Sequence, residues 1–387
     1  MSKLFTPLRI GPIELRNRSI RAAAFEGMCP NNSVSKDLIN YHTTLAAGEI
    51  GMTTVAYASV SKNGLSFSHQ MWIRKEIIPS LKELTNAIHS NGAKASIQLG
   101  HCGNMAKYRT IKSRAIAPSA IPNLYAMTFP REMQQSDINE IVNDFKQATK
   151  YAIEAGFDAV EIHAGHGYLI SQFLSPYTNH RSDSYGGSLV NRMRFMEEVI
   201  IAVLEEAKDK IAVLVKMNMR DGFKGGMERD ESLLVAKKLQ ELGVNALVLS
   251  GGFVSKSPMY VMKGAMPFKT LAAHTDETYL RFFIKRFGQF LVKQERFSEN
   301  YFLEEALYFR QNLQLPLIYV GGILSEKNIE EVLMKGFDGV AMARCLIENP
   351  NFISDIKNKT NVQSACNTCN HCIACIYNNK FECSLHP

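Results

Sequence analysis

Two histidines and a tyrosine stand at close spacing directly after an apolar run near the middle of the chain. His163, His166 and Tyr168 follow residues 157–162, FDAVEI, which are typical of a short buried strand. Imidazoles can hold a carbonyl or anionic oxygen, and a phenol is a proton donor that stays neutral at physiological pH unless it is perturbed. Together these side chains suit a reaction that builds negative charge on a carbonyl group. A packing role is the alternative for any single histidine, but the cluster weakens it.

Apolar runs recur along the chain, with amphipathic helical patterns between most of them. Residues 137–155, for instance, have apolar side chains at helical spacing from Ile138 to Ala152. Alternating strands and helices favour parallel pairing, and eight such units favour a closed barrel. We therefore predict an α/β fold, a single (β/α)8 TIM barrel over residues 1–350, followed by a short cysteine-rich C-terminal tail over residues 351–387. The eight predicted strands cover residues 19–22, 52–56, 94–99, 159–162, 213–217, 246–249, 317–320 and 339–342.

Glycines mark the ends of three predicted helices. Gly156, Gly243 and Gly336 each stand between a helical pattern and the next predicted strand. Glycine at that place fits a left-handed helix cap.

Two long insertions and one basic helical region interrupt the regular alternation. They cover residues 106–136, 255–276 and 279–314. We expect these segments to shape the mouth of a substrate site or a contact between subunits of a homo-oligomer.

Composition limits the classes of protein. With 387 residues and 46% apolar content, the chain can bury one large core. Its net charge of +7 comes from scattered residues, without basic clusters interleaved with aromatics, so nucleic-acid binding is disfavoured. The first residues lack the pattern of a secretory signal, and no apolar run approaches the roughly 20 residues that span a membrane. We therefore expect a cytoplasmic protein.

A longer segment around the histidines resembles a known family signature. Residues 161–195 read EIHAGHGYLISQFLSPYTNHRSDSYGGSLVNRMRF and resemble the old yellow enzyme family, the FMN-containing ene-reductases built on a TIM barrel. The resemblance continues from residues 4–7, LFTP, to Met342, Ala343 and Arg344 near the end of the predicted barrel. It implies an NAD(P)H-dependent flavin oxidoreductase.

Two loops at the end of the predicted barrel fit a phosphate site. Gly321 and Gly322 follow the seventh predicted strand, and Ala343 and Arg344 follow the eighth. Loops at these strands commonly form a phosphate site in this fold, where bare backbone can approach the ligand. The resemblance assigns all four residues to the FMN phosphate.

The remaining flavin contacts predicted by the resemblance come from other strands. Gln98 ends the third strand and is assigned to the flavin pyrimidine, although an amide there could simply cap the strand. Lys216 is a charge inside an apolar run, which is costly unless it is paired. The resemblance places its cation near flavin N1, and a salt bridge inside the barrel is the alternative. Tyr57 is also assigned to the cofactor site.

The end of the first predicted strand departs from the family pattern. Many members have a threonine or cysteine near the flavin C4 carbonyl, whereas this chain has Ala22, Ala23, Ala24 and Phe25. We assign these four residues to cofactor binding through their backbone. The missing hydroxyl or thiol should change the flavin potential.

The resemblance implies a mechanism. NADH or NADPH would reduce FMN, which would then reduce a small-molecule substrate, an α,β-unsaturated carbonyl compound. His163 and His166 would bind its carbonyl oxygen, and Tyr168 would protonate the α-carbon. The alternatives are a flavoenzyme with another acceptor, such as an amine, a nitro compound or a quinone, and a redox sensor.

Cysteines are concentrated in the tail. Cys366, Cys369, Cys372, Cys375 and Cys383 lie within the last 22 residues, a density typical of a metal site or a redox-sensitive cluster. Relatives that reduce 2,4-dienoyl-CoA hold a 4Fe-4S cluster at a comparable place, but with their third cysteine one residue further along. The preferred metal ligands are Cys366, Cys369, Cys372 and Cys383. An iron–sulfur cluster, zinc and redox-active thiols all stay open.

Overall fold

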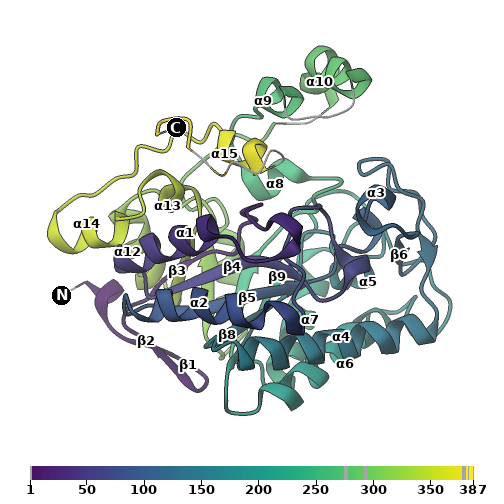
Figure 1. Cartoon of the computed structure of the whole chain (residues 1–387), viewed down its shortest axis with the longest axis horizontal. Helices are drawn as coiled ribbons and strands as arrows, with labels where there is room; N and C mark the ends of the chain where they lie inside the picture. Colours follow the sequence, from purple (N-terminus) through teal and green to yellow (C-terminus); the bar gives the residue numbers. More distant parts are fainter. Residues whose placement is uncertain (1, 274–277, 292–293, 377–380, 382, 387) are drawn as a thin grey trace.

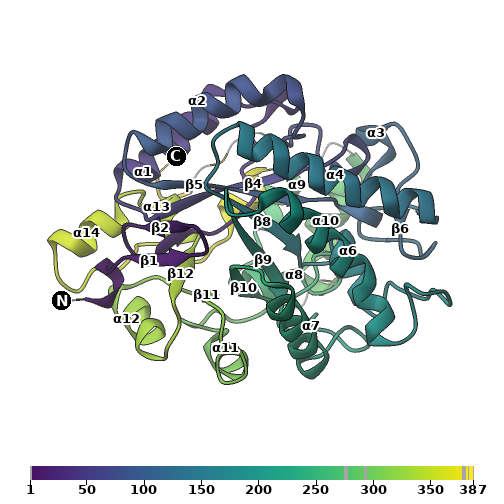
Figure 2. The same cartoon turned by 90° about the horizontal axis from the view of Figure 1, so that it is seen from below.

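A closed barrel of eight parallel strands forms the centre of the molecule (Figures 1 and 2). The computed structural model describes residues 2–273, 278–291, 294–376, 381 and 383–386. Each barrel strand pairs with the next one along the chain, and the last pairs with the first. The predicted (β/α)8 TIM barrel is confirmed. The strands are β3 (Ser19–Arg21), β4 (Met52–Ser59), β5 (Lys94–Gly100), β8 (Ala159–Ala164), β9 (Ala212–Asn218), β10 (Ala246–Ser250), β11 (Leu317–Val320) and β12 (Gly339–Met342).

Amphipathic helices cover the outside of the barrel. In α4 (Gln135–Glu154), predicted as residues 137–155, the buried side chains include Ile138, Ile141 and Phe145, which recur at helical spacing. Side chains of Gln134 and Asp137 form a capping box that fixes where this helix begins. The other outer helices are α1 (Lys36–Ala47), α2 (Ile78–His89), α6 (Leu189–Ala207), α7 (Arg229–Leu242), α11 (Leu303–Arg310), α12 (Glu326–Met334) and α14 (Phe352–Asn358).

The three predicted glycine caps have the expected backbone. Gly156, Gly243 and Gly336 have φ values of 83°, 86° and 92°, in the left-handed region that a side chain rarely adopts. Each glycine turns the chain from a helix into the following strand, so the prediction is confirmed.

A hairpin of β1 (Leu8–Ile10) and β2 (Ile13–Leu15) closes the amino end of the barrel. Its buried apolar side chains pack with inward residues of the barrel strands, such as Met52 and Leu214. The turn residue Gly11 lies directly against Asn245, the residue before β10. Because this end is filled, a site can open only at the carboxyl ends of the strands, where TIM barrels hold their active sites.

The insertions follow β5 and β10. Residues 106–136 contain α3 (Tyr108–Ile111), β6 (Ile116–Ala117) and β7 (Arg131–Glu132), and residues 255–273 contain α8 (Pro258–Met262) and α9 (Phe268–Ala273). Residues 274–276 of the second insertion lie outside the described residues. The predicted helical region 279–314 is divided between α10 (Thr278–Leu291) and α11.

The tail returns to the carboxyl end of the barrel. It carries the short helix α15 (His371–Cys375), preceded after β12 by α13 (Arg344–Glu348) and α14. Figure 1 shows α15 (yellow) beside α8 and α9 (green), and the imidazole of His371 lies 3.3 Å from the hydroxyl of Thr270 on α9. The domain boundary at residue 350 stays a prediction. No helix in the described part of the chain combines the length and apolar character needed to cross a membrane.

Candidate active site

The structure brings the three predicted catalytic side chains together at the end of β8. The rings of His163 and Tyr168 are 4.6 Å apart and those of His163 and His166 are 5.1 Å apart, measured between centroids. Tyr57, from β4, lies 5.1 Å from Tyr168 and completes the cluster. His166 has a left-handed backbone, with φ at 60°, and its Nε2 lies 2.8 Å from Ser250 Oγ on β10. This bend turns the imidazole towards β10.

Burial keeps both imidazoles uncharged. Desolvation lowers the pKa of His163 well below its usual range, and electrostatic interactions with His166 and Lys216 lower it further. Desolvation, followed by the charge of Lys216, lowers the pKa of His166 to about 3. Desolvation also raises the pKa of Tyr168 above its usual value, so the phenol keeps its proton. The site therefore presents neutral hydrogen-bond donors and a protonated acid at physiological pH.

The depressed pKa of His166 predicts a loss of stability in acid. In the unfolded chain His166 has a pKa of about 6.5 and takes up a proton near that pH, whereas in the folded chain it stays neutral until the pH approaches about 3. The contribution of neutral His166 to the free energy of unfolding is therefore fully present above pH 6.5 and is lost as the pH falls towards 3. Urea unfolding at several pH values should show a shallower acid slope in His166→Gln than in the native chain. His180→Gln is the control, because His180 is exposed. An identical acid slope in His166→Gln and His180→Gln would contradict the low pKa of His166.

A buried ion pair lies inside the barrel near the histidines. Lys216 Nζ is 2.9 Å from Glu161 Oε1, and both side chains are only 3% exposed. Gln98 donates its amide N–H to the same oxygen at 2.7 Å. Desolvation lowers the pKa of Lys216 and Glu161 opposes this shift. Lys216 thus forms the salt bridge that the sequence offered as an alternative, and Gln98 bonds to the same carboxylate.

The backbone after β3 reaches the same ion pair. Lys216 Nζ donates to Ala23 O at 3.1 Å, and the amide of Ala22 donates to Met342 O at 2.7 Å. Arg21 donates to Ala24 O, which ties this loop to the end of β3. The ring of Phe25 stacks on Phe67, with centroids 5.0 Å apart. The alanines therefore contribute backbone alone.

The predicted phosphate loops lie after β11 and β12. Gly321 and Gly322 have φ values of 145° and 76°, which favour glycine at both positions. A side chain on either one would collide with the segment around Tyr301. Arg344, the first residue of α13, donates from Nη1 to Lys263 O at 2.8 Å, and Ala343 precedes it as the helix cap. The loops thus combine bare backbone with a cation.

These donors fit the chemistry of a flavin. A buried ammonium and an amide stand side by side within the barrel, as the carbonyl-rich pyrimidine edge of a flavin requires. The guanidinium of Arg344 and the glycine backbone after β11 are each groups that suit a phosphate. The assignment of individual residues to FMN stays a prediction.

Several residues of the site were not anticipated from the sequence. Glu161 carries the same signal as Lys216, a charge in an apolar strand, and it lies two residues before His163 on the same side of β8. Beneath the loop after β3, Arg21 Nη1 pairs with Glu26 Oε1 at 2.6 Å, and His42 Nε2 lies 3.4 Å from the same oxygen. Only the folded chain brings these three residues together.

The tail cysteines are grouped, but they do not form a metal site in the structure. Burial raises the pKa of Cys372 to about 12, and the neighbouring thiols of Cys366, Cys369 and Cys383 contribute to the shift. Within the described residues, no set of three or more His, Cys, Asp or Glu side chains is arranged to hold a metal ion. The assignment of Cys366, Cys369, Cys372 and Cys383 as metal ligands stays a prediction.

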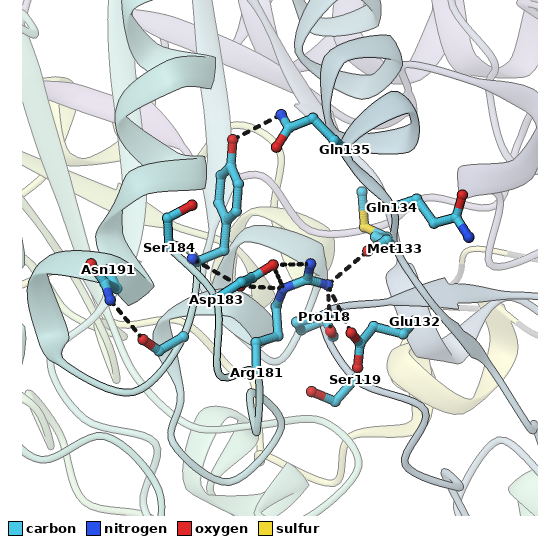
Figure 3. A network of polar contacts seen from close by, with 12 residues as sticks. Pro118, Ser119, Glu132, Met133, Gln134, Gln135, Arg181, Asp183, Ser184 and Asn191 are labelled. Carbon is cyan, nitrogen blue, oxygen red and sulfur yellow. Dashed lines mark hydrogen bonds and ion pairs between the residues drawn. The ribbon is translucent and has the colours of Figure 1, made fainter.

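A buried arginine joins the insertion after β5 to the loop after α5 (Leu169–Leu174), as Figure 3 shows. Arg181, from the latter loop, donates to Pro118 O at 3.0 Å and to Met133 O at 2.7 Å. Its second Nη lies 2.5 Å from Asp183, which aligns the guanidinium. This arrangement ties the insertion after β5 to the loop that follows α5.

Replacing Arg181 with Ala should loosen this insertion. Two backbone carbonyls would lose their buried donor, at a cost of about 1–3 kcal/mol for each unsatisfied group. We expect a lower free energy of urea unfolding and faster hydrogen exchange over residues 115–135. Arg194→Ala is the matched control, because this exposed arginine also bonds to the same loop, at Ser184 O. Equal effects of the two substitutions would contradict the role of Arg181.

The match to a family model gives the class of protein, since this barrel is that of a flavin-dependent oxidoreductase. The chain belongs to the NADH:flavin oxidoreductase / NADH oxidase family, whose model matches residues 3–363. The family predicted from residues 161–195 is therefore confirmed.

One known protein supports the family assignment by its sequence, and two solved structures support the fold. The chain is 38% identical to a 4,4'-dithiodibutanoate disulfide reductase of Rhodococcus erythropolis, over 97% of this chain and 93% of that protein. Its fold is similar to that of a 2-naphthoyl-CoA reductase, with a TM-score of 0.85 and 22% identity over 100% of this chain and 57% of the other. An old yellow enzyme homologue from Zymomonas mobilis gives a TM-score of 0.73 at 22% identity, over 95% and 96% of the two chains.

Proposed function

We propose that the protein uses FMN and NADH or NADPH to reduce an alkene conjugated to a carbonyl group. The observation that carries this proposal is the cluster of His163, His166 and Tyr168, in which the uncharged imidazole of His163 lies against both the uncharged imidazole of His166 and the protonated phenol of Tyr168. Such donors bind a neutral carbonyl oxygen and hold it more strongly as negative charge develops there.

In this proposal, residues from several barrel strands and loops would hold the flavin. Lys216 and Gln98 would hold the pyrimidine edge, and Gly321, Gly322 and Arg344 the phosphate. When bound, FMN supplies hydride-transfer chemistry between the nicotinamide and the alkene. The remaining contacts would come from Tyr57, from Ala343 and from the backbone of Ala22, Ala23, Ala24 and Phe25.

The hydrogen bonds of the histidines indicate which atoms face the substrate. The backbone amide of Gly165 points at His163 Nδ1 over 3.4 Å, which leaves Nε2 to carry the proton and donate it. Ser250 engages His166 Nε2, which leaves Nδ1 for the carbonyl oxygen. Tyr168 then transfers its hydroxyl proton to the α-carbon, and both histidines stay neutral.

The visible absorption spectrum tests this proposal directly. Purified protein should show flavin absorption that bleaches when NADH or NADPH is added anaerobically and recovers when cyclohexenone follows. Bleaching without recovery would keep the cofactor and reject the alkene acceptor. No flavin absorption, even after FMN is supplied, would reject the proposal as a whole.

A second acceptor is favoured by one relative. The Rhodococcus protein described above is named for reduction of an organic disulfide and matches nearly the whole chain. In that reaction the hydride breaks the S–S bond, one thiolate leaves, and Tyr168 could supply its proton, giving two thiols and oxidised nicotinamide. Recovery of the flavin spectrum with 4,4'-dithiodibutanoate, but not with cyclohexenone, would favour this acceptor.

The state of the tail cysteines is tested separately. A 4Fe-4S cluster on Cys366, Cys369, Cys372 and Cys383 would give about four iron and four acid-labile sulfide atoms per chain. Analysis of anaerobically purified protein for iron, sulfide and zinc distinguishes the cluster from zinc and from free thiols.

A further inference from the structure

An asparagine of the tail is buried against the predicted phosphate site. Asn370 lies between Cys369 and Cys372 and is only 3% exposed. Its backbone is left-handed, with φ at 56°, and it stands directly before α15. The side-chain amide is engaged at both ends. Oδ1 accepts from Arg344 Nη1 at 2.8 Å, and Nδ2 donates to Met262 O and Ala265 O, each at 2.9 Å.

The guanidinium of Arg344 is held by the same arrangement. Its Nη1 also donates to Lys263 O at 2.8 Å and lies 3.3 Å from Met262 O. On another side, the guanidinium lies over the ring of Phe297, 5.3 Å from its centroid. Asn370 therefore bonds both to Arg344 and to the loop that fixes Arg344.

The tail and this loop are also joined through their backbones. The amide of Ala265 donates to Thr368 O at 3.2 Å. Gly264 has φ at 135°, and a Cβ atom there would lie 2.4 Å from Thr368 O. Such close approach agrees with Figure 1, where the tail passes beside α8. The position of Asn370 is thus set by contact between segments that are about a hundred residues apart.

Only an amide satisfies all of these partners at once. Asparagine can accept from a cation and donate two N–H groups within one short side chain. An aspartate in its place would lose both donors and would bring a negative charge next to Arg344. An apolar side chain would leave one donor and two carbonyls without this partner. The hydrogen-bonding chemistry therefore indicates that Asn370 orients Arg344 and does not merely fill space.

We propose that Asn370 is a positioning residue that orients Arg344 for the phosphate group of the flavin. The proposal rests on the proposed function, since it takes Arg344 as a phosphate ligand. The cysteine tail is then a structural part of the cofactor site. Any change that moves the segment between Cys369 and Cys372 will alter the affinity for the flavin phosphate.

Comparison of FMN with riboflavin isolates this effect, because riboflavin lacks only the phosphate. The Kd of each flavin is measured by fluorescence quenching for the native chain, Asn370→Ala and Asn370→Asp. We expect FMN binding to weaken about tenfold or more in Asn370→Ala, and further in Asn370→Asp, with riboflavin binding nearly unchanged. Asn367→Ala is the matched control, since this exposed amide belongs to the same segment and contacts the amide of Cys369 instead.

The outcomes separate the two proposals. A native chain that binds neither flavin rejects the proposed function and this inference with it. A native chain that prefers FMN, combined with equal losses of FMN and riboflavin in the folded Asn370 variants, rejects the positioning role alone. An unchanged ratio in Asn370→Asp, which has the shape of asparagine and so tests charge without loss of volume, rejects it as well.

Discussion

Tyr168→Phe is expected to slow the reoxidation of reduced flavin by cyclohexenone about 10²–10⁴-fold, the usual contribution of a positioned general acid. The substitution removes one hydroxyl and keeps the ring, whose contacts with Tyr57 and His163 fill the site. Reduction of the flavin by nicotinamide requires no proton from this phenol, so that half-reaction should keep its rate.

Stopped-flow absorbance measures the two half-reactions separately and gives the effect on each. Tyr108→Phe is the control, because Tyr108 is 70% exposed on α3 and loses the same atom. Equal slowing of both half-reactions would mean that Tyr168 acts on flavin binding or on the shape of the pocket. A normal rate of reoxidation would move the proton donor elsewhere.

The fold could be predicted from the sequence because its signals are local. All eight predicted strands are present, and each differs from the structure by at most a few residues. Apolar runs and glycine caps such as Gly243 depend only on neighbouring residues, so they predict strands and helix ends without knowledge of the barrel. The predicted cluster of His163, His166 and Tyr168 is also a local signal, since the end of β8 and the residues that follow it carry all three.

The contacts that complete the site could not be predicted in this way. Glu161 binds Gln98 from 63 residues away, and Asn370 reaches Met262 from 108 residues away. Such pairs depend on which strands become neighbours and on where the tail returns. A single sequence gives a charge in an apolar strand, as at Lys216, but it does not give the partner that makes the charge tolerable.

The loop after β3 shows a departure that the sequence did reveal. The structure places Ala23 O beside Lys216, and the alanine side chains offer no hydroxyl or thiol to a cofactor. Arg21, Glu26 and His42 lie buried beneath this loop and bond to its backbone and to β4. The loop can therefore hold its shape through a charged cluster that contributes no side chain to the site.

Lys216→Met should lower the free energy of unfolding by about 3–5 kcal/mol, because it leaves the carboxylate of Glu161 buried without its cation. Gln98 would remain as a donor to that carboxylate, but an amide does not balance the charge. Glu161→Gln should cost less. In that variant Lys216, whose pKa is already lowered by burial, can lose its proton and become neutral.

The double variant Lys216→Met with Glu161→Gln decides whether the charge is responsible, since it removes both charges and keeps most of the volume. Its unfolding free energy should recover much of the loss seen in Lys216→Met alone, a coupling that urea titration of the four flavin-free proteins measures. Additive losses would mean that packing explains the effect of Lys216→Met. If the double variant recovers its stability but binds FMN weakly or not at all, the ammonium of Lys216 serves the cofactor. Glu161 would then be the residue that stabilises a buried cation at the place where the flavin needs one.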